Sequence, residues 1–256
     1  MTNDDGVTSP GLHALAAAAG DLDAEVMVVA PSSDQSGTGA AIRPLHSSGT
    51  VAFESVTLPG LEAVLAYRVD CPPALAVLSA VLGSQELRPD LVLSGINIGL
   101  NLGVAVLHSG TVGAALTATN LGLPAVAVSI DAGRRPHWAT AAAIAEAAAR
   151  WLSATRLPVV LNINVPDVGV EDLAGVRSAT LSRFRGARAE SGTPDDILDL
   201  EPDSDAFLVR HGFATITVLH GLREAGHETG SDAASFVEDV VSGQRWQSTG
   251  LASLRT

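Results

Sequence analysis

Apolar runs of strand length alternate with helical patterns along residues 1–165. The apolar runs are rich in Val, Ile and Leu, as buried strands are, and Gly, Pro or Ser separates them from the helical stretches. Strands separated by helices in this way predict crossover connections and a mostly parallel sheet. The predicted strands are residues 24–30, 64–69, 90–93, 124–130 and 159–165, and the predicted helices are residues 9–20, 72–82, 110–121 and 137–153.

The pattern changes after Pro166, where charged residues, Gly, Pro and Ser become frequent. Two strand-like pieces, residues 206–210 and 213–219, are separated by His-Gly and predict a hairpin. Residues 223–256 are polar, with one amphipathic stretch at 233–241. We therefore expect an α/β protein with a doubly wound, Rossmann-like, mostly parallel sheet and a C-terminal β-hairpin and tail. Residues 1–166 form the core in this prediction, and residues 167–256 form the hairpin and tail of the same domain.

Composition narrows the class of partner. The formal net charge is −13 and only 15 residues are basic, so the chain lacks the positive surface of a nucleic-acid backbone binder or of a protein attracted to anionic membranes. An anionic substrate would need a metal ion or backbone N–H donors. The single cysteine, Cys71, permits no internal disulfide. Neither a signal segment nor an apolar run of membrane-spanning length is seen, which predicts a soluble cytoplasmic protein.

Three polar segments follow predicted strands, or the place where a strand is expected. They are residues 3–6 (NDDG), 32–39 (SSDQSGTG) and 94–103 (SGINIGLNLG). In a doubly wound sheet, ligands bind beyond the carboxyl ends of the strands. We therefore expect these segments to meet in one site.

Asp4 and Asp5 are the strongest candidates for a metal site. Two close carboxylates repel one another unless a cation neutralises them, and a hard divalent ion prefers oxygen ligands. Ser36, Asn97 and Asn101 supply hydroxyl and amide oxygens from the other two segments. The alternative is that the two aspartates only cap the helix that begins near residue 9.

The segment Ser109-Gly110-Thr111 opens a predicted helix. It is either a plain N-cap or a phosphate-binding turn, because backbone N–H groups at a helix N-terminus attract anions.

Together these segments resemble the SurE survival protein family of metal-dependent nucleotidases. The resemblance rests on TNDDGVTSPGLHAL (2–15), VVAPSSDQSGTGAAI (28–42), PDLVLSGINIGLNLG (89–103) and HSGTVGAALTATNLGLPAVAVS (108–129), with looser matches at LNINVP (161–166) and GFATITVL (212–219). It implies hydrolysis of nucleoside 5′- or 3′-monophosphates with Mg²⁺ or Mn²⁺. It also implies a homodimer or homotetramer formed through the C-terminal hairpin and tail.

The resemblance also implies roles for particular residues. The metal ligands would be Asp4, Asp5, Ser36 and Asn97. The phosphate would lie beside Asn101, Ser109, Gly110 and Thr111, with Asp4 orienting or deprotonating the attacking water and Asn101 and Ser109 assisting catalysis.

The chain departs from the family pattern in three places. Members usually carry a first strand of four or five apolar residues before NDDG, whereas here only Met1 and Thr2 precede it, which predicts a start set too late. Val104, Ala105 and His108 replace the usual polar residues and Tyr around the phosphate loop. Cys71 is expected to be a small structural residue, and His108 to line the pocket.

Three other functions compete with the nucleotidase interpretation. An aspartyl-phosphate phosphatase needs its two aspartates two residues apart, whereas Asp4 and Asp5 are adjacent. A Rossmann oxidoreductase needs a G-x-G-x-x-G segment after its first strand, which is missing. A non-catalytic nucleotide-binding regulator remains the alternative if the short first strand disables the metal site.

Overall fold

The computed structural model describes residues 1–42, 51–83, 89–133, 135–183 and 200–223. The chain divides into two compact units, Met1–Gly221 and Leu222–Thr256, and the description that follows concerns the first. The predicted amphipathic stretch at residues 233–241 lies outside the described residues.

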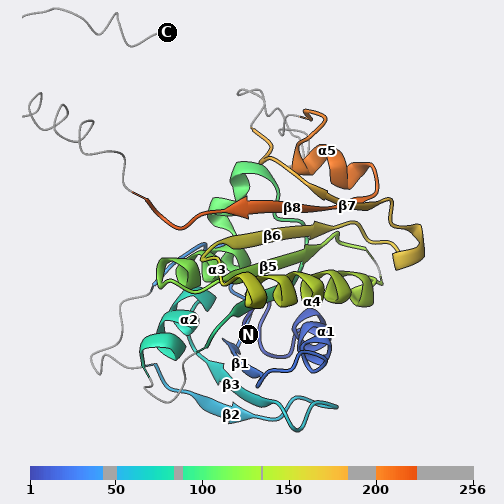
Figure 1. Cartoon of the computed structure of the whole chain (residues 1–256). Helices are drawn as coiled ribbons and strands as arrows, with labels where there is room; N and C mark the ends of the chain where they lie inside the picture. Colours follow the sequence, from blue (N-terminus) through green and yellow to red (C-terminus); the bar gives the residue numbers. More distant parts are fainter. Residues whose placement is uncertain (43–50, 84–88, 134, 184–199, 224–256) are drawn as a thin grey trace, which may run out of the picture. The chain divides into compact units, whose positions relative to one another are not determined.

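Two groups of strands make up the sheet. One has the order β1-β3-β2, and the other has the order β4-β5-β6-β8-β7. Figure 1 follows this order from β2 through β1, β5 and β6 to β8. The strands are β1 (Met27–Pro31), β2 (Glu54–Val56), β3 (Leu65–Val69), β4 (Val92–Ile98), β5 (Ala125–Ile130), β6 (Val160–Val165), β7 (Gly175–Ser178) and β8 (Phe213–Leu219).

Met1 and Thr2 lie between β1 and β4 and join the two groups. The Val29 N–H donates to the Met1 carbonyl at 2.9 Å, and the Thr2 N–H donates to the Leu93 carbonyl at 3.0 Å. Thr2 also forms a parallel bridge with Ser94. These two residues therefore occupy the position in which the resemblance places the first strand, and they direct the chain from there into Asn3-Asp4-Asp5-Gly6.

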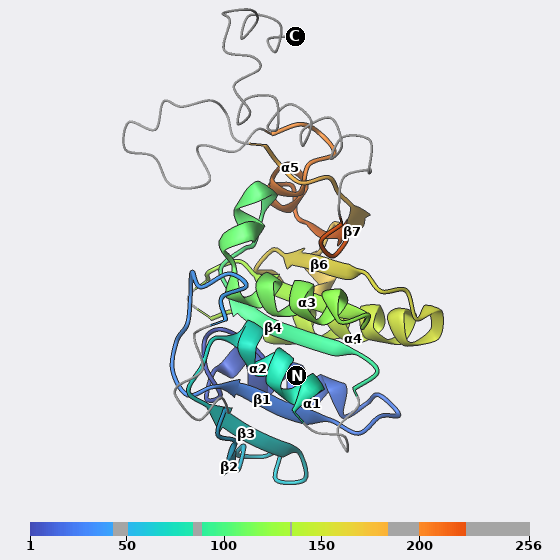
Figure 2. The ribbon, with the colours of Figure 1, turned by 90° about the vertical axis from the view of Figure 1, so that its left-hand side faces the viewer.

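Helices cover both faces of the sheet. Two of them, α1 and α4, pack with the Val and Ile side chains on one face of β5 and β6. The other two long helices, α2 and α3, pack against the opposite face, where Ala125 and Ala127 of β5 alternate with those residues. Figure 1 shows α4 in front of β5, and Figure 2, turned by 90°, shows α3 in front of the strands. The helices are α1 (Pro10–Ala19), α2 (Pro73–Leu82), α3 (Gly110–Asn120) and α4 (Trp138–Thr155), with short helices η1 (Gly103–His108), η2 (Val170–Asp172) and α5 (Asp205–Arg210).

The predicted fold class is confirmed: α/β crossovers build a largely parallel sheet with helices on both faces. The starts of α1 and α3 agree with the pattern because each of these two helices begins with a serine cap. Ser9 caps α1 with Pro10 at its first position, and Ser109 caps α3. Among the described residues, no helix is both long and apolar enough to cross a membrane.

The predicted hairpin is wrong. Residues 205–210 form the helix α5, which Ser204 caps by accepting a hydrogen bond from the Phe207 N–H. An apolar run this short has no periodicity that separates a strand from a helix, so the local cap and tertiary packing decide. The strand β8 instead pairs antiparallel with β6 and parallel with β7, which places β7 and β8 within the sheet of the core.

A second correction concerns Ser94-Gly95-Ile96-Asn97, which was expected in a loop. These residues continue β4 as far as Ile98, and the ladder to β5 shifts register between Ser94 and Asn97. The two glycines and two asparagines predicted a turn, but pairing with β5 keeps the segment extended.

Candidate metal and phosphate site

The three predicted polar segments meet at the carboxyl ends of adjacent strands. The segment after β1 contacts the aspartate segment, because the Gln35 N–H donates to the Asp4 carbonyl at 2.7 Å. The aspartate segment in turn contacts residues 94–103, because the Ile98 backbone hydrogen-bonds to the Asp5 carboxylate. Hydrogen bonds therefore link the three segments at one edge of the parallel sheet.

Asn3 and Gly6 shape the turn that carries the two aspartates. The Asn3 side chain accepts a hydrogen bond from the Gly6 N–H at 3.2 Å, and both residues are buried. Gly6 has a φ of +102°, a conformation that side-chain-bearing residues rarely adopt. This turn reverses the chain directly after Asp5 and so allows adjacent carboxylates to serve one site.

Asp4 lies against the N-terminus of α3. Its side chain is only 3% exposed and accepts hydrogen bonds from the Thr111 N–H at 3.0 Å and the Thr111 hydroxyl at 2.5 Å. A Cβ on Gly110 would lie 2.7 Å from the Asp4 Oδ2 atom, so only glycine leaves room for this carboxylate. The capping alternative is wrong, because Ser9 caps α1, whereas Asp4 accepts from Thr111 in the first turn of α3, whose N-cap is Ser109.

Asp5 is half-buried, and its environment disfavours its charged form. Burial, the nearby Asp4 charge and, to a smaller degree, Asp34 raise the pKa of Asp5 from 3.8 to about 6, while a hydrogen bond from the Ile98 backbone opposes them. A nearby cation would favour the charged form of this carboxylate and lower its pKa again. Asp34 is a functional candidate that the sequence pattern did not single out, although it stands in the same polar segment as Ser36.

Ser36 and Asn97 lie within the two flanking segments, residues 32–39 and 94–103. The Ser36 hydroxyl donates to the Asp34 Oδ1 atom at 2.6 Å, and the bond from Ser36 lowers the pKa of Asp34. The Asn97 amide nitrogen donates to the Gly99 carbonyl at 2.6 Å. That bond orients the Asn97 side chain and leaves its Oδ1 atom, the atom a metal would use, as an acceptor.

Asn101 is fixed by four hydrogen bonds from β5 and β6. Its backbone N–H donates to the Asn164 Oδ1 atom at 2.7 Å, and its carbonyl accepts from the Asn162 and Asn164 amides. Its own amide donates to the Ser129 hydroxyl at 2.7 Å. The polar side chains of Ser129, Asn162 and Asn164 are fully buried and were missed as site residues. The alternation Asn-Ile-Asn inside an apolar strand was the signal that could have found them.

The phosphate candidates Ser109, Gly110 and Thr111 are all buried at the start of α3. The Ser109 Oγ atom accepts from the Val112 N–H at 3.1 Å, as an N-cap does, and the hydroxyl proton remains to be donated. Thr111 directs its N–H and hydroxyl to Asp4. Ser109 is therefore the N-cap of α3, and this helix end lies against a candidate metal ligand, whereas phosphate binding here stays a prediction.

The donor set fits a hard divalent ion. The described residues contain no group of three or more His, Cys, Asp or Glu side chains able to hold a metal. An ion here would therefore rest on the Asp4 and Asp5 carboxylates with the Ser36 hydroxyl and Asn97 amide oxygens. Such an all-oxygen set suits Mg²⁺ or Mn²⁺ better than a soft or nitrogen-preferring ion. The raised pKa of Asp5 agrees with a site that a cation completes.

Cys71 takes the structural place expected of it, whereas a pocket-lining role for His108 stays a prediction. Cys71 is 3% exposed and packs in a hydrophobic cluster with Val69 and Leu75. His108 is exposed at the end of η1, and its backbone carbonyl anchors Gly39.

A doubly wound sheet with an oxygen-ligand site beside a helix N-terminus is typical of α/β proteins that bind phosphate groups. Comparisons with known proteins make the assignment specific. The family model described as Survival protein SurE matches residues 1–188, and the chain belongs to this family.

Relatives and a solved structure agree with the family assignment. The chain is 39% identical over 250 residues to the protein named 5′-nucleotidase SurE 1 of Thermus thermophilus, with 88% of the chain and 94% of the relative covered. It is 37% identical over 237 residues to the 5′-nucleotidase SurE of Alkalilimnicola ehrlichii, covering 86% and 87%. The crystal structure of the SurE protein from Aquifex aeolicus superimposes with a TM-score of 0.73 at 26% identity, covering 93% of this chain and 98% of that one.

Proposed function

We propose that this chain is a 5′/3′-nucleotidase that hydrolyses nucleoside 5′- or 3′-monophosphates to nucleoside and phosphate, with one divalent ion, Mg²⁺ or Mn²⁺. Family membership and the nucleotidase names of the curated relatives support this function. The observation that carries it in the chain itself is the bonding of Asp4 to Thr111 at the start of α3. That contact brings a candidate metal ligand and a candidate phosphate-binding helix end to one place.

Asp4, Asp5, Ser36 and Asn97 would hold the ion. When bound, it would supply positive charge to the phosphoryl group and acidify a coordinated water. Asp4 is the carboxylate that Thr111 holds in one orientation, so we assign it the additional role of orienting the attacking water.

The phosphate end of the site is built by Asn101 and by the start of α3. The Ser109 hydroxyl and the Asn101 side chain are the proposed donors to the phosphate oxygens, and Gly110 lets the group approach the helix end closely. Because the bonds from Asn164, Asn162 and Ser129 already orient Asn101, little conformational entropy remains to be lost on binding substrate.

The non-catalytic alternative required the short first strand to disable the metal site. Met1 and Thr2 are hydrogen-bonded to β1 and β4, and the turn that follows brings Asp4 to α3. This arrangement favours the enzyme over the regulator.

The proposed function is tested by phosphate release from 5′-AMP and 3′-AMP with added Mn²⁺ or Mg²⁺, compared with the same protein in EDTA. Release that depends on the metal supports the proposal. Release at an equal rate in EDTA, or no release with either metal, contradicts it. Trapping an acid-stable phosphoenzyme would instead favour the aspartyl-phosphate mechanism.

Two further expectations belong to the same proposal. We propose a cytoplasmic protein that forms a homodimer or homotetramer through its C-terminal region, with a nucleoside monophosphate as its substrate and no polymeric nucleic acid as a partner. Sedimentation velocity of the whole chain tests the assembly. A single species at the monomer mass at assay concentration would contradict it.

A further inference from the structure

Asp205, the first residue of α5, is a carboxylate buried away from solvent and far along the chain from the site. Its exposed fraction is 0%, and its Oδ1 atom accepts from the Ser182 hydroxyl at 2.6 Å and from the Ser182 N–H at 3.0 Å. The Ala206 N–H also donates to Oδ1, at 2.8 Å. A buried carboxylate is tolerated only when donors surround it in this way, so its position is tightly determined.

The remaining oxygen of Asp205 contacts the segment that carries the phosphate candidates. Its Oδ2 atom accepts from the Gly103 N–H at 2.7 Å, across 102 positions of sequence. The next N–H along, that of Val104, donates to the Ser182 carbonyl at 3.1 Å. Gly103 has a φ of +57°, so the chain turns sharply at the point where it is held.

This attachment lies between the two proposed phosphate contacts. Asn101 stands two residues before Gly103 and is fixed to β6, while Ser109 follows directly after η1. Segment 99–109 is thus held at Asn101 by β5 and β6 and at Gly103 by Asp205. The bond from the Val104 N–H to the Ser182 carbonyl and that from the Gly39 N–H to the His108 carbonyl also attach η1. Asp205 and Ser182 together therefore fix the start of η1.

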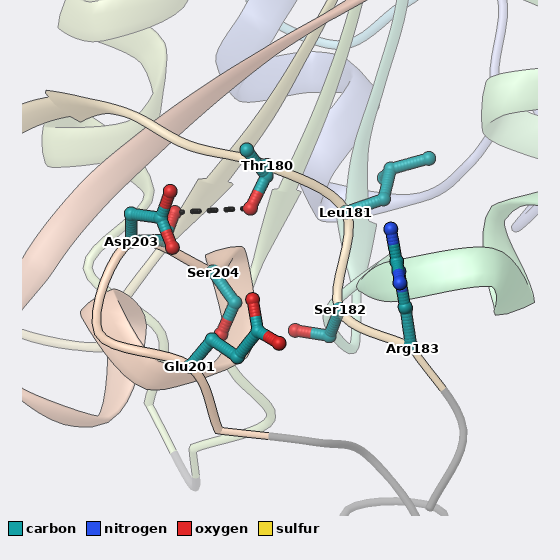
Figure 3. Close-up of a pocket in the computed structure, with 7 residues that line it drawn as sticks. All are labelled: Thr180, Leu181, Ser182, Arg183, Glu201, Asp203 and Ser204. Carbon is teal, nitrogen blue, oxygen red and sulfur yellow. Dashed lines mark hydrogen bonds between the residues drawn. The ribbon is translucent and has the colours of Figure 1, made fainter.

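Hydrogen bonds also hold together the two segments that flank Asp205, residues 180–183 and 201–204. Figure 3 shows residues 180–183 running beside residues 201–204, with the Thr180 hydroxyl bonded to the Asp203 carbonyl. The backbone adds two bonds, from the Thr180 N–H to the Asp203 carbonyl at 3.0 Å and from the Asp205 N–H to the Thr180 carbonyl at 2.9 Å. These residues line a cavity of about 140 Å³ whose rim is polar and exposed, whereas Ser182, Ser204 and Asp205 are buried beneath it.

We propose that Asp205 is a positioning residue for the phosphate end of the active site. By holding Gly103 it sets the course of segment 99–109, and through that segment it sets the placement of Asn101 and Ser109. The proposal rests on the nucleotidase function proposed above. A purely structural Asp205 would stabilise α5 without changing the order of segment 99–109 or the affinity for phosphate.

The test compares Asp205→Asn with Asp203→Asn, a matched change of an exposed carboxylate two residues away. Asparagine keeps the size of the side chain but replaces one acceptor oxygen with an amide that cannot accept from an N–H group. Amide hydrogen exchange is measured for peptides covering residues 99–109 and, as an internal reference, α4, in metal-free protein. Binding of inorganic phosphate and of Mn²⁺ is measured on the same samples, together with kcat and KM for 5′-AMP.

In Asp205→Asn we expect exchange in residues 99–109 to accelerate about tenfold while α4 is unchanged, because loss of an anchoring bond opens the segment locally. We also expect phosphate affinity to fall and KM to rise, each about tenfold, on the scale of other supporting-shell changes. Mn²⁺ affinity should stay within about twofold, because Asp4 and Asp5 are held elsewhere. Asp203→Asn should match the wild type throughout.

Unchanged exchange in residues 99–109, or unchanged phosphate affinity in a folded Asp205→Asn protein, would overturn the proposal. If that variant does not fold, Ser182→Ala removes one donor to Asp205 and should give a smaller acceleration in the same segment, and no acceleration would again overturn it. Failure of the proposed function looks different. If the wild-type chain releases no phosphate from nucleotides, the nucleotidase function is contradicted. The hydrogen-exchange data would still report whether Asp205 holds segment 99–109.

Discussion

At the scale of single residues, the contact between Thr111 and Asp4 is the most consequential one in the site. Replacing Thr111 with Val keeps the side-chain shape but removes the hydroxyl that donates to a buried carboxylate. We expect Mn²⁺ affinity to fall by about 10- to 100-fold, the usual cost of losing a partner that orients a metal ligand. Calorimetric titration with Mn²⁺ measures this, with Thr117→Val, whose hydroxyl bonds the Gly113 carbonyl within α3, as the control. Equal affinities in the two variants would show that the Thr111 hydroxyl does not support the site.

Asp5 makes the stability of the metal-free protein depend on pH. Its pKa is raised from 3.8 to about 6 in the folded chain, so the folded state holds this proton more tightly than the unfolded state. The free energy of unfolding in EDTA should therefore fall as pH rises between these two values, and level off above them. Urea unfolding across this interval measures the effect, and Asp5→Asn should flatten that part of the curve. If the free energy of unfolding changes with pH in the same way in the wild type and in Asp5→Asn, the pKa of Asp5 is not raised in the folded chain.

How far residues can be identified from sequence depends on whether their role is local. Asp4, Asp5, Ser36 and Asn97 occur in short polar segments at strand ends, and the structure places these segments together. Asn164 and Asp205 serve the same region through contacts that span 63 and 102 positions. No local pattern encodes such a partner, because the contact exists only after the sheet has formed.

At the scale of elements, the helix α5 is the clearest departure from the pattern. Residues 206–210 resemble a strand by composition, but Ser204 supplies an N-cap and Asp205 is fixed by Gly103 and Ser182. The helices α1 and α3 were predictable because their caps and small residues agree with their tertiary setting. Tertiary bonds decide the form of α5, and those were not readable from its own residues.

If the Ser204 cap stabilises α5, its removal should change the free energy of unfolding. Ser204→Ala removes the acceptor for the Phe207 N–H and should lower the free energy of unfolding by about 1 kcal/mol. Ser204→Gly is the matched comparison, because glycine at an N-cap costs only a few tenths of that amount. Urea denaturation of both variants gives the difference. If Ala and Gly prove equally stable there, residues 205–210 are not held by this cap.

At the scale of the whole molecule, metal binding and folding stability should be linked. An ion that binds only the folded chain stabilises it by about 2.7 kcal/mol when its concentration is 100 times the dissociation constant. Thermal unfolding with increasing Mn²⁺ should therefore shift upward in the wild type and in Asp23→Asn, an exposed control carboxylate outside the site. Asp5→Asn should show little shift. A similar shift in all three proteins would place the ion elsewhere.

The topology of the whole sheet explains why residues that are distant in sequence lie together at the proposed site. The sheet brings the ends of β1 and β4 together beside the start of α3, and the short bridge of Met1 and Thr2 delivers the aspartates between them. The acidic chain, with its net charge of −13, would repel a phosphate over most of its surface. In the proposed site, a bound cation and the N-terminus of α3 would reverse this repulsion locally.

The most direct test of the central claim is phosphate release from 5′-AMP by EDTA-treated protein after Mn²⁺ is restored, in the wild type and in Asp5→Asn. We predict that the wild type regains its activity as Mn²⁺ is added, and that Asp5→Asn remains at least about 100-fold slower at the same Mn²⁺ concentration, since even supporting-shell changes reach this scale. Equal recovery of the two proteins, or full wild-type activity before any metal is added, would contradict the account.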